Sequence, residues 1–245
     1  MKNGLKLILM FAIITTMSYS SGENLDNIPD GPGDLYRTAQ IDISAKKYSN
    51  AIEKMKKVVE IAPKDEGVRL EIARVYKSAG EIENSCKEYE YSIKIEQDNE
   101  VIFEYGNLCF QNKKYNKAFE VFKKDKSENY KNEFGAAVAA RLAGNFDEAE
   151  VYYKKVITKN PDLADAYFGL GVVYQKQKSY DAAIENFRKY LKRKKNEDVY
   201  SILSSLYMLK EDYIKAKETI NKGLKEYPDS EKLKKLSKIA SAKKN

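Results

Sequence analysis

The feature that most constrains this chain is a pattern that recurs six times along its 245 residues. In each copy a small residue follows an aromatic or apolar one by three positions, and a large residue follows the small one by four. The small residues are Ala51, Ser85, Ala118, Ala149, Ala183 and Ala216, at steps of 34, 33, 31, 34 and 33, and the large ones are Met55, Tyr89, Phe122, Tyr153, Phe187 and Ile220. A period of this length is typical of repeat architectures, in which each unit buries its apolar face only against its neighbours.

Each copy also holds two apolar stripes with helical spacing, separated by a short turn such as Ala79-Gly80-Glu81 or Ala143-Gly144-Asn145. Small residues let paired helices approach closely, and the large ones fill the space beside them. The pattern therefore predicts an all-α chain built from stacked helical hairpins.

The copies resemble the tetratricopeptide repeat, whose signature spans 34 residues. The fifth copy carries the signature on Tyr167, Leu170, Gly171, Tyr174, Ala183 and Phe187, and the sixth on Tyr200, Leu203, Ser204, Tyr207, Ala216, Ile220 and Pro228. The resemblance implies a right-handed superhelical solenoid of about six helix-turn-helix units, followed by a capping helix.

Unit boundaries follow from the repeat. We expect units at 32–65, 66–98, 99–129, 130–163, 164–196 and 197–229, and a capping helix and tail at 230–245 that covers the last repeat with Leu233, Leu236 and Ile239. The third unit is short and places Asp125 where a small buried residue is expected. We predict that its second helix ends early and that a slight hinge or a change of superhelical pitch near Asp125–Tyr130 divides the array into two groups of three.

The first twenty residues have the layout of a secretory signal. Lys2 and Lys6 precede an apolar run at 7–14, and Ser18 and Ser20 are small residues at the positions that a signal peptidase recognises. We expect residues 1–20 to be a signal peptide that is cleaved near Ser20, 21–31 to be a flexible linker, and the protein to be exported to the periplasm or secreted. The apolar run is shorter than the about 20 residues of a transmembrane helix, so no span is expected in the mature chain.

Composition argues against catalysis. The chain has no histidine, which removes the imidazole-based nucleophile systems and most zinc sites. Gly169-Leu170-Gly171 lies inside a helical pattern rather than after a strand, so it does not indicate a dinucleotide site. The sequence predicts no enzyme, no cofactor and no metal site.

The formal charge of +7 is uneven. Residues 187–245 carry 17 basic and 8 acidic side chains, and residues 1–186 carry 27 and 29. One interpretation is a solvated lysine-rich surface, and the other is a partner at this end that is an anionic envelope polymer or lipid. The basic residues are nearly all lysine, so nucleic acid is not expected as a partner.

The resemblance also implies a protein or peptide partner in a concave groove lined by the first helix of each unit. By alignment the groove residues are Tyr36, Leu70, Arg74, Phe103, Asn107, Phe110, Phe134, Val138, Arg141, Phe168, Val172 and Gln175. Five of them, Tyr36, Leu70, Phe103, Phe134 and Phe168, occupy one position in successive units, and Ser201 follows in the sixth. These five are called the first-helix row below. The row forms either an apolar binding groove or packing between neighbouring helices, and Arg74 and Arg141 would steer acidic residues of a ligand.

Two functions remain open at this stage. The first is a non-catalytic scaffold or adaptor of the cell envelope or secreted space that binds a polypeptide segment in the groove. The second is a structural subunit of an envelope assembly of the pilus or outer-membrane type. Cys86 and Cys109 lie at similar heights on expected neighbouring helices, so they are either a disulfide pair or two small apolar thiols.

Overall fold

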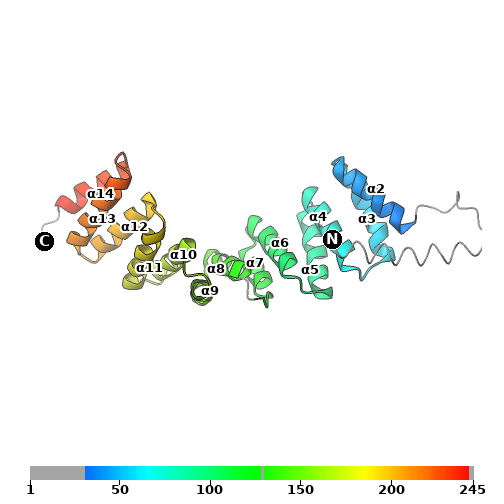
Figure 1. Ribbon diagram of the computed structural model, residues 1–245, viewed down its shortest axis with the longest axis horizontal. Helices are drawn as coiled ribbons and strands as arrows, with labels where there is room; N and C mark the ends of the chain where they lie inside the picture. Colours follow the sequence, from blue (N-terminus) through cyan, green and yellow to red (C-terminus); the bar gives the residue numbers. More distant parts are fainter. Residues whose placement is uncertain (1–30, 128–129, 243–245) are drawn as a thin grey trace, which may run out of the picture. The chain divides into compact units, whose positions relative to one another are not determined.

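The computed structural model describes residues 31–127 and 130–242, and these residues form thirteen α-helices and no strand (Figure 1). The predicted all-α class is thereby confirmed. The predicted signal peptide at 1–20 and nearly all of the predicted linker at 21–31 lie outside the described residues.

The helices fall into two compact units, divided between Asn112 and Lys113. Unit 1 contains α2 (Pro32–Ser44), α3 (Tyr48–Ile61), α4 (Glu66–Ser78), α5 (Ile82–Ile95) and α6 (Asn99–Gln111). Within it α2 packs on α3, α4 packs on α5, and α3–α4 and α5–α6 contacts join the hairpins. Aspartates begin two of these helices, because the side chains of Asp65 and Asp98 accept backbone N–H groups of the first turns of α4 and α6.

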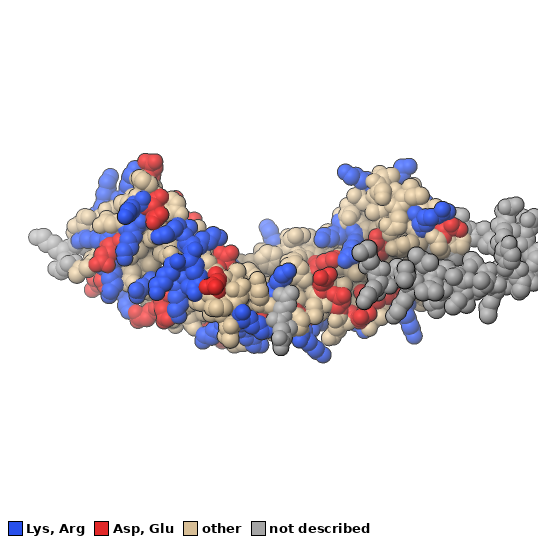
Figure 2. Space-filling view, viewed as in Figure 1, with Lys and Arg blue, Asp and Glu red and all other residues tan. Residues whose placement is uncertain are grey.

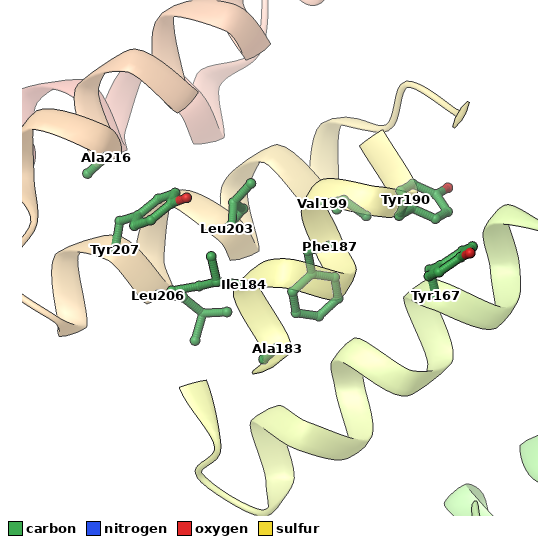
Figure 3. Packing of buried hydrophobic residues seen from close by; sticks show 10 residues of the cluster. All are labelled: Tyr167, Ala183, Ile184, Phe187, Tyr190, Val199, Leu203, Leu206, Tyr207 and Ala216. Atoms are coloured by element: carbon green, nitrogen blue, oxygen red, sulfur yellow. The ribbon is translucent and has the colours of Figure 1, made fainter. Parts of the chain in front are cut away.

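Unit 2 contains α7 (Tyr115–Phe122), α8 (Tyr130–Ala143), α9 (Phe146–Lys159), α10 (Ala164–Lys176), α11 (Tyr180–Arg193), α12 (Glu197–Leu209), α13 (Tyr213–Glu226) and α14 (Glu231–Ala242). Here α8 pairs with α9, α10 with α11, and α12 with α13, while α7 packs on α8 and α14 packs on α12 and α13. Tyr167, Phe187, Leu203 and Tyr207 belong to one apolar cluster that joins α10, α11 and α12 (Figure 3).

The third repeat ends early, as its sequence predicts. Helix α7 has 8 residues, whereas the second helices α3 and α9 have 14 each. Asp125 accepts hydrogen bonds from Ser127 N (2.7 Å) and from Asn132 Nδ2 on α8 (2.7 Å). This carboxylate therefore connects the α7–α8 segment to α8. The boundary between the two compact units lies between α6 and α7, and not at the position predicted for the hinge.

The two residue columns that define the repeat are buried at every copy. Ala51, Ser85, Ala118, Ala149, Ala183 and Ala216 are fully buried, and so, to within 2 % exposure, are Met55, Tyr89, Phe122, Tyr153, Phe187 and Ile220. Ser85 takes the place of alanine because its hydroxyl donates to the carbonyl of Ala73 at 2.7 Å, which satisfies its hydrogen bond in the core.

The turn between the two helices of each repeat uses a left-handed residue. Positive φ occurs at Lys46, Gly80, Lys113, Gly144, Lys178 and Glu211, with values between 57° and 86°. Only two of the six are glycines, although an L side chain in this conformation costs about 1 kcal/mol. The turn geometry is therefore a property of the repeat and not of its glycines.

Helix α14 covers the last repeat, but not with all three predicted residues. Leu233 is fully buried and Leu236 is half-buried, whereas Ile239 is 53 % exposed and Ala240 is buried in its place. The helix is seated by Ser230, whose hydroxyl accepts Leu233 N at 3.1 Å and donates to Glu197 on α12. This seating sets the rotation of α14 and turns Ile239 to the surface.

Candidate functional site

The first-helix row lies outside the buried core in both units. Tyr36 on α2, Leu70 on α4, Phe134 on α8 and Phe168 on α10 are half-buried, and Phe103 on α6 is 37 % exposed. Ser201, at the same position on α12, is buried and donates to the carbonyl of Glu197 at 3.1 Å. The apolar row therefore ends before the sixth repeat.

In unit 2 the phenyl rings of the row rest on rings of the second helices. Phe134 meets Tyr153 edge-on, with ring centroids 6.1 Å apart, and Phe168 meets Phe187 at 6.0 Å and Tyr190 at 5.7 Å. Pairs in this geometry add to the stability of the core beyond the area they bury. Each phenyl of the row therefore has one packed side while part of it stays accessible.

In unit 1 the predicted steering residue Arg74 is bound to a carboxylate. Its Nε and Nη2 donate to Glu104 on α6 at 3.0 and 2.5 Å, and Glu104 also accepts the hydroxyl of Tyr89 at 2.9 Å. Burial alone would raise the pKa of Glu104, but the hydrogen bonds from Arg74 and Tyr89 outweigh it and hold that pKa below its usual value. A bidentate pair of this kind fixes α4 beside α6.

The second predicted steering residue, Arg141 on α8, is bound differently. Its Nε donates to the hydroxyl of Tyr153 at 3.1 Å, and burial, partly offset by the charge of Arg141, raises the pKa of that hydroxyl. Among the described residues no carboxylate lies within 4.0 Å of this guanidinium. The charge of Arg141 is therefore not neutralised locally.

The other predicted groove residues lie on the same first helices as the row and are partly accessible. Asn107 and Phe110 on α6, Val138 on α8, and Val172 and Gln175 on α10 are all half-buried. Val172 packs against the same apolar cluster as Phe168. The structure thus brings together the α10 residues of the site.

Both cysteines lie close enough to Tyr105 to act on its hydroxyl. Cys86 on α5 is half-buried and Cys109 on α6 is buried. Burial, together with the charges of the two sulfurs, raises the pKa of Tyr105 well above its usual value. Disulfide formation between them stays a prediction.

A hollow that the sequence analysis did not identify lies on a different face of unit 2. It measures about 670 Å³ and is bounded by α11, α12 and α13. Its cations belong to the lysine-rich end at residues 187–245. Its walls come from the fifth and the sixth repeat, so the hollow cannot be recognised from the sequence of either repeat alone.

Within residues 31–127 and 130–242 no cluster of three or more metal-ligating side chains is found. Over the same ranges, none of the helices has both the length and the apolar composition that crossing a bilayer requires.

Comparison with known proteins agrees with the geometry. Models of the tetratricopeptide repeat match residues 140–206 and 197–230. The solved structure of YrrB, described as a tetratricopeptide-repeat protein with an unusual peptide-binding site, superposes with a TM-score of 0.61 at 19 % identity and covers 75 % of this chain and 97 % of its own. The chain therefore contains tetratricopeptide repeats, which the family models match over residues 140–230.

Two further proteins are similar to this tetratricopeptide-repeat protein. PilW, a widely conserved type IV pilus biogenesis factor, superposes with a TM-score of 0.54 at 18 % identity, covering 85 % of this chain and 99 % of its own. The human protein O-mannosyl-transferase TMTC1 is 22 % identical over 159 residues. That match covers 64 % of this chain but only 18 % of the transferase. At these identities the likenesses show the fold alone.

Proposed function

We propose that this tetratricopeptide-repeat protein is a non-catalytic adaptor that holds an extended or helical polypeptide segment against the first-helix row. The observation that carries the proposal is the accessibility of the row. Its five side chains occupy one register position on successive first helices, and none of them belongs to the buried core.

Partly exposed rings on a rigid base suit the binding of a polypeptide. Phe134 and Phe168 are held from behind by Tyr153 and Phe187, so they lose little conformational freedom when a ligand covers them. Burying the open part of each ring would contribute roughly 1–3 kcal/mol of binding free energy. Two or three such rings would together contribute roughly 2–9 kcal/mol, so a micromolar affinity, about 8 kcal/mol, also needs contacts from the rest of the ligand.

The charges beside the row differ between the two units. In unit 2 Arg141 would meet an acidic side chain, because its charge is not already neutralised. In unit 1 Arg74 is bound by Glu104, so an acidic ligand there would first have to displace that carboxylate. We therefore expect an acidic side chain of the ligand beside Arg141 on α8.

We place this adaptor outside the cytoplasm. The support is the charged, apolar and small-residue layout of residues 1–20. Amino-terminal sequencing of the protein from its native host should find a chain that begins near Ser21 or Glu23. An intact Met1 on cytoplasmic protein would refute export.

The adaptor is tested by removing the row without disturbing the core. Phe103→Ser combined with Phe134→Ser leaves the stacked Phe168 in place, and Val151→Ser, on the exposed face of the second helix α9, is the matched control. We expect pull-down from envelope extracts, analysed by mass spectrometry, to recover a partner with wild type and with the control but not with the double variant. Helical circular dichroism must be the same for all three.

The alternative is a structural subunit of an envelope assembly, which the likeness to PilW favours. It predicts that the double variant still assembles and still recovers the same partners. Loss of helical structure in the double variant would show that the rings are core, and it would count against the groove.

A further inference from the structure

Unit 2 carries a second surface whose shape and charge point to a ligand. The α11–α13 cleft is lined by Arg188, Leu191, Lys192 and Lys195 of α11 and the residues after it, by Tyr200, Leu203 and Tyr207 of α12, and by Asp212, Ile214, Lys215, Glu218, Thr219 and Lys222 of α13 and the residue before it. A smaller hollow of about 350 Å³, which shares Arg188, Tyr207, Asp212 and Lys215, extends it toward Asp181 at the start of α11. From Asp181 to Lys192 the helix advances about 17 Å, the length of about five extended residues.

This cleft is not part of the first-helix row. On α12 the row position is Ser201, whereas the floor of the cleft is made by Leu203 and Tyr207. At 100° per residue these two lie about 200° and 240° around the helix from Ser201. The two surfaces therefore use different faces of α12.

The cleft carries more positive charge than its neighbours neutralise. It holds five cations and two carboxylates. Lys215 pairs with Asp212 at 2.6 Å and Lys195 with Glu226 at 3.1 Å. Arg188, Lys192 and Lys222 have no carboxylate within 4.0 Å among the residues that the structure describes. The charge of Arg188 also acts against that of Lys215, from the opposite wall.

The preceding repeat does not repeat this charge. The four cation positions Arg188, Lys192, Lys215 and Lys222 correspond to Lys154, Thr158, Ala182 and Lys189. Lys154 is paired with Glu150 and Lys189 with Glu185, each at 2.6 Å. The preceding pair of second helices, α9 and α11, therefore lacks the excess of cations found between α11 and α13, and Figure 2 shows Lys and Arg side chains gathered over α11 to α14.

The cleft also has apolar surface between its charges. Ile214 is 58 % exposed and Leu191 is half-buried, whereas Leu203 and Tyr207 in the floor are at most 7 % exposed. A highly hydrated anionic polymer has nothing to place against these side chains, and a flat lipid surface does not enter a recess between two helices. A peptide with carboxylates on either side of an apolar residue matches both features.

We infer that the α11–α13 cleft binds an acidic peptide segment of a partner protein, with an apolar side chain of the segment against Leu191 and Ile214 and its carboxylates on Arg188, Lys192 and Lys222. The segment displaces no existing ion pair, because these three cations are not engaged by carboxylates of the described chain. This site is independent of the polypeptide held by the first-helix row.

The test uses a fluorescent octapeptide in which Glu alternates with Leu, and the full chain. Lys192→Glu combined with Lys222→Glu should weaken binding at least about tenfold. The matched control is Lys217→Glu combined with Lys225→Glu, which makes the same charge change on the same unit outside the cleft. Ile214→Ser should weaken binding about threefold to tenfold, and Leu209→Ser, at an equally exposed leucine, should not.

Further measurements distinguish an acidic peptide from other ligands of the cleft. Binding should weaken as salt rises, because exposed charges are screened, and it should survive Phe103→Ser combined with Phe134→Ser. No binding of the peptide to folded wild type, or equal loss in both double charge variants, would overturn the inference. So would tighter binding of polyphosphate or of phosphatidylglycerol vesicles that the cleft variant abolishes.

A second copy of this chain is a further occupant to be measured. Residues 23–30 alternate acidic with apolar side chains at Glu23, Leu25, Asp26, Ile28 and Asp30. Analytical ultracentrifugation of wild type and the cleft variant should show the same monomeric species. Self-association that the cleft variant abolishes would assign the cleft to the chain itself and overturn a partner protein.

Discussion

Units 1 and 2 are built from the same buried columns, yet their surfaces have opposite charge. Residues 31–112 carry 12 basic and 15 acidic side chains, whereas residues 113–245 carry 30 and 19. In unit 1 the arginine beside the row is neutralised by Glu104, whereas in unit 2 Arg141, Arg188 and Lys192 have no carboxylate within 4.0 Å in the described chain. Buried positions are constrained by packing and surface positions are not, so one repeat can present different chemistry in different copies.

The largest effect that separates the units concerns a close helix approach in unit 2. A Cβ on Gly169 of α10 would lie 2.2 Å from the ring of Tyr153 on α9. We expect Gly169→Ala to lower the free energy of unfolding by about 3 kcal/mol, because the packed ring has no space to move into. Urea unfolding followed by circular dichroism measures it.

The control for this prediction is in unit 1. No atom lies within 4 Å of a Cβ on Gly33, so Gly33→Ala should leave the unfolding midpoint nearly unchanged. If the two variants unfold alike, the close approach in unit 2 is not the cause.

A smaller effect compares one network in each unit. Glu104 accepts from Tyr89 and bidentately from Arg74, and Glu150 accepts from Tyr174 at 3.0 Å and from Lys154 at 2.6 Å. We expect Glu104→Gln to cost about 1.5 kcal/mol and Glu150→Gln about 0.5 kcal/mol, because the guanidinium fork between two helices loses one of its two acceptor oxygens and the charge, whereas the pair with Lys154 on one helix loses only the charge. Thermal unfolding of both variants decides the order, and an equal cost would contradict it.

The turns allow two substitutions that should change the free energy of unfolding in opposite directions. Lys178 in unit 2 has φ 61° and Gly80 in unit 1 has φ 78°. Lys178→Gly should stabilise the protein by up to about 1 kcal/mol, and Gly80→Ala should destabilise it by about 1 kcal/mol, because only the L side chain is strained there. Chemical denaturation of the two variants should shift the midpoint in opposite directions.

The smallest expected effect is that of low pH on the free energy of unfolding. Burial would raise the pKa of Glu104, but the hydrogen bonds from Arg74 and Tyr89 lower it on balance. The hydrogen bond from Lys154 lowers the pKa of Glu150. Both carboxylates therefore bind protons less tightly in the folded state than in the unfolded state. Their stabilisation is complete above the unfolded-state pKa of about 4.3 and is lost as pH falls through the lower folded-state values.

Stability measured between pH 6 and pH 3 checks this sign. The decline with falling pH should be shallower in the Glu104→Gln and Glu150→Gln variants, since each has lost one of the titrating groups. A wild-type stability that rises on acidification would contradict both pKa directions.

Much of the fold was predictable because the repeat is a local pattern. The small and large columns that the sequence marks, such as Ala183 and Phe187, are the buried ones, and the departure at Asp125 does end α7 early. The exposure of Ile239 could not be predicted, because the rotation of α14 is set by the bond of Ser230 to Glu197 on another helix. The boundary between units was also missed, because Asp125 binds forward to Asn132.

For the candidate site, the sequence predicted only that the row residues occupy the same position in successive repeats. Sequence alignment placed Phe134 and Phe168 on one row, but it could not show that Tyr153 and Phe187 support them. Nor could it show that Arg74 is held by Glu104, thirty positions along the chain. The α11–α13 cleft was missed for the same reason, since Arg188 and Lys222 face each other only after two repeats stack.

The shortness of α7 has a mechanical consequence. A helix of 8 residues closes about four hydrogen bonds between its own residues, whereas a second helix of 14 closes about ten. Under a stretching force along the chain, α7 therefore resists with less than half the backbone bonding of α9. We expect α7 to unfold at a lower force than the longer helices of the other hairpins.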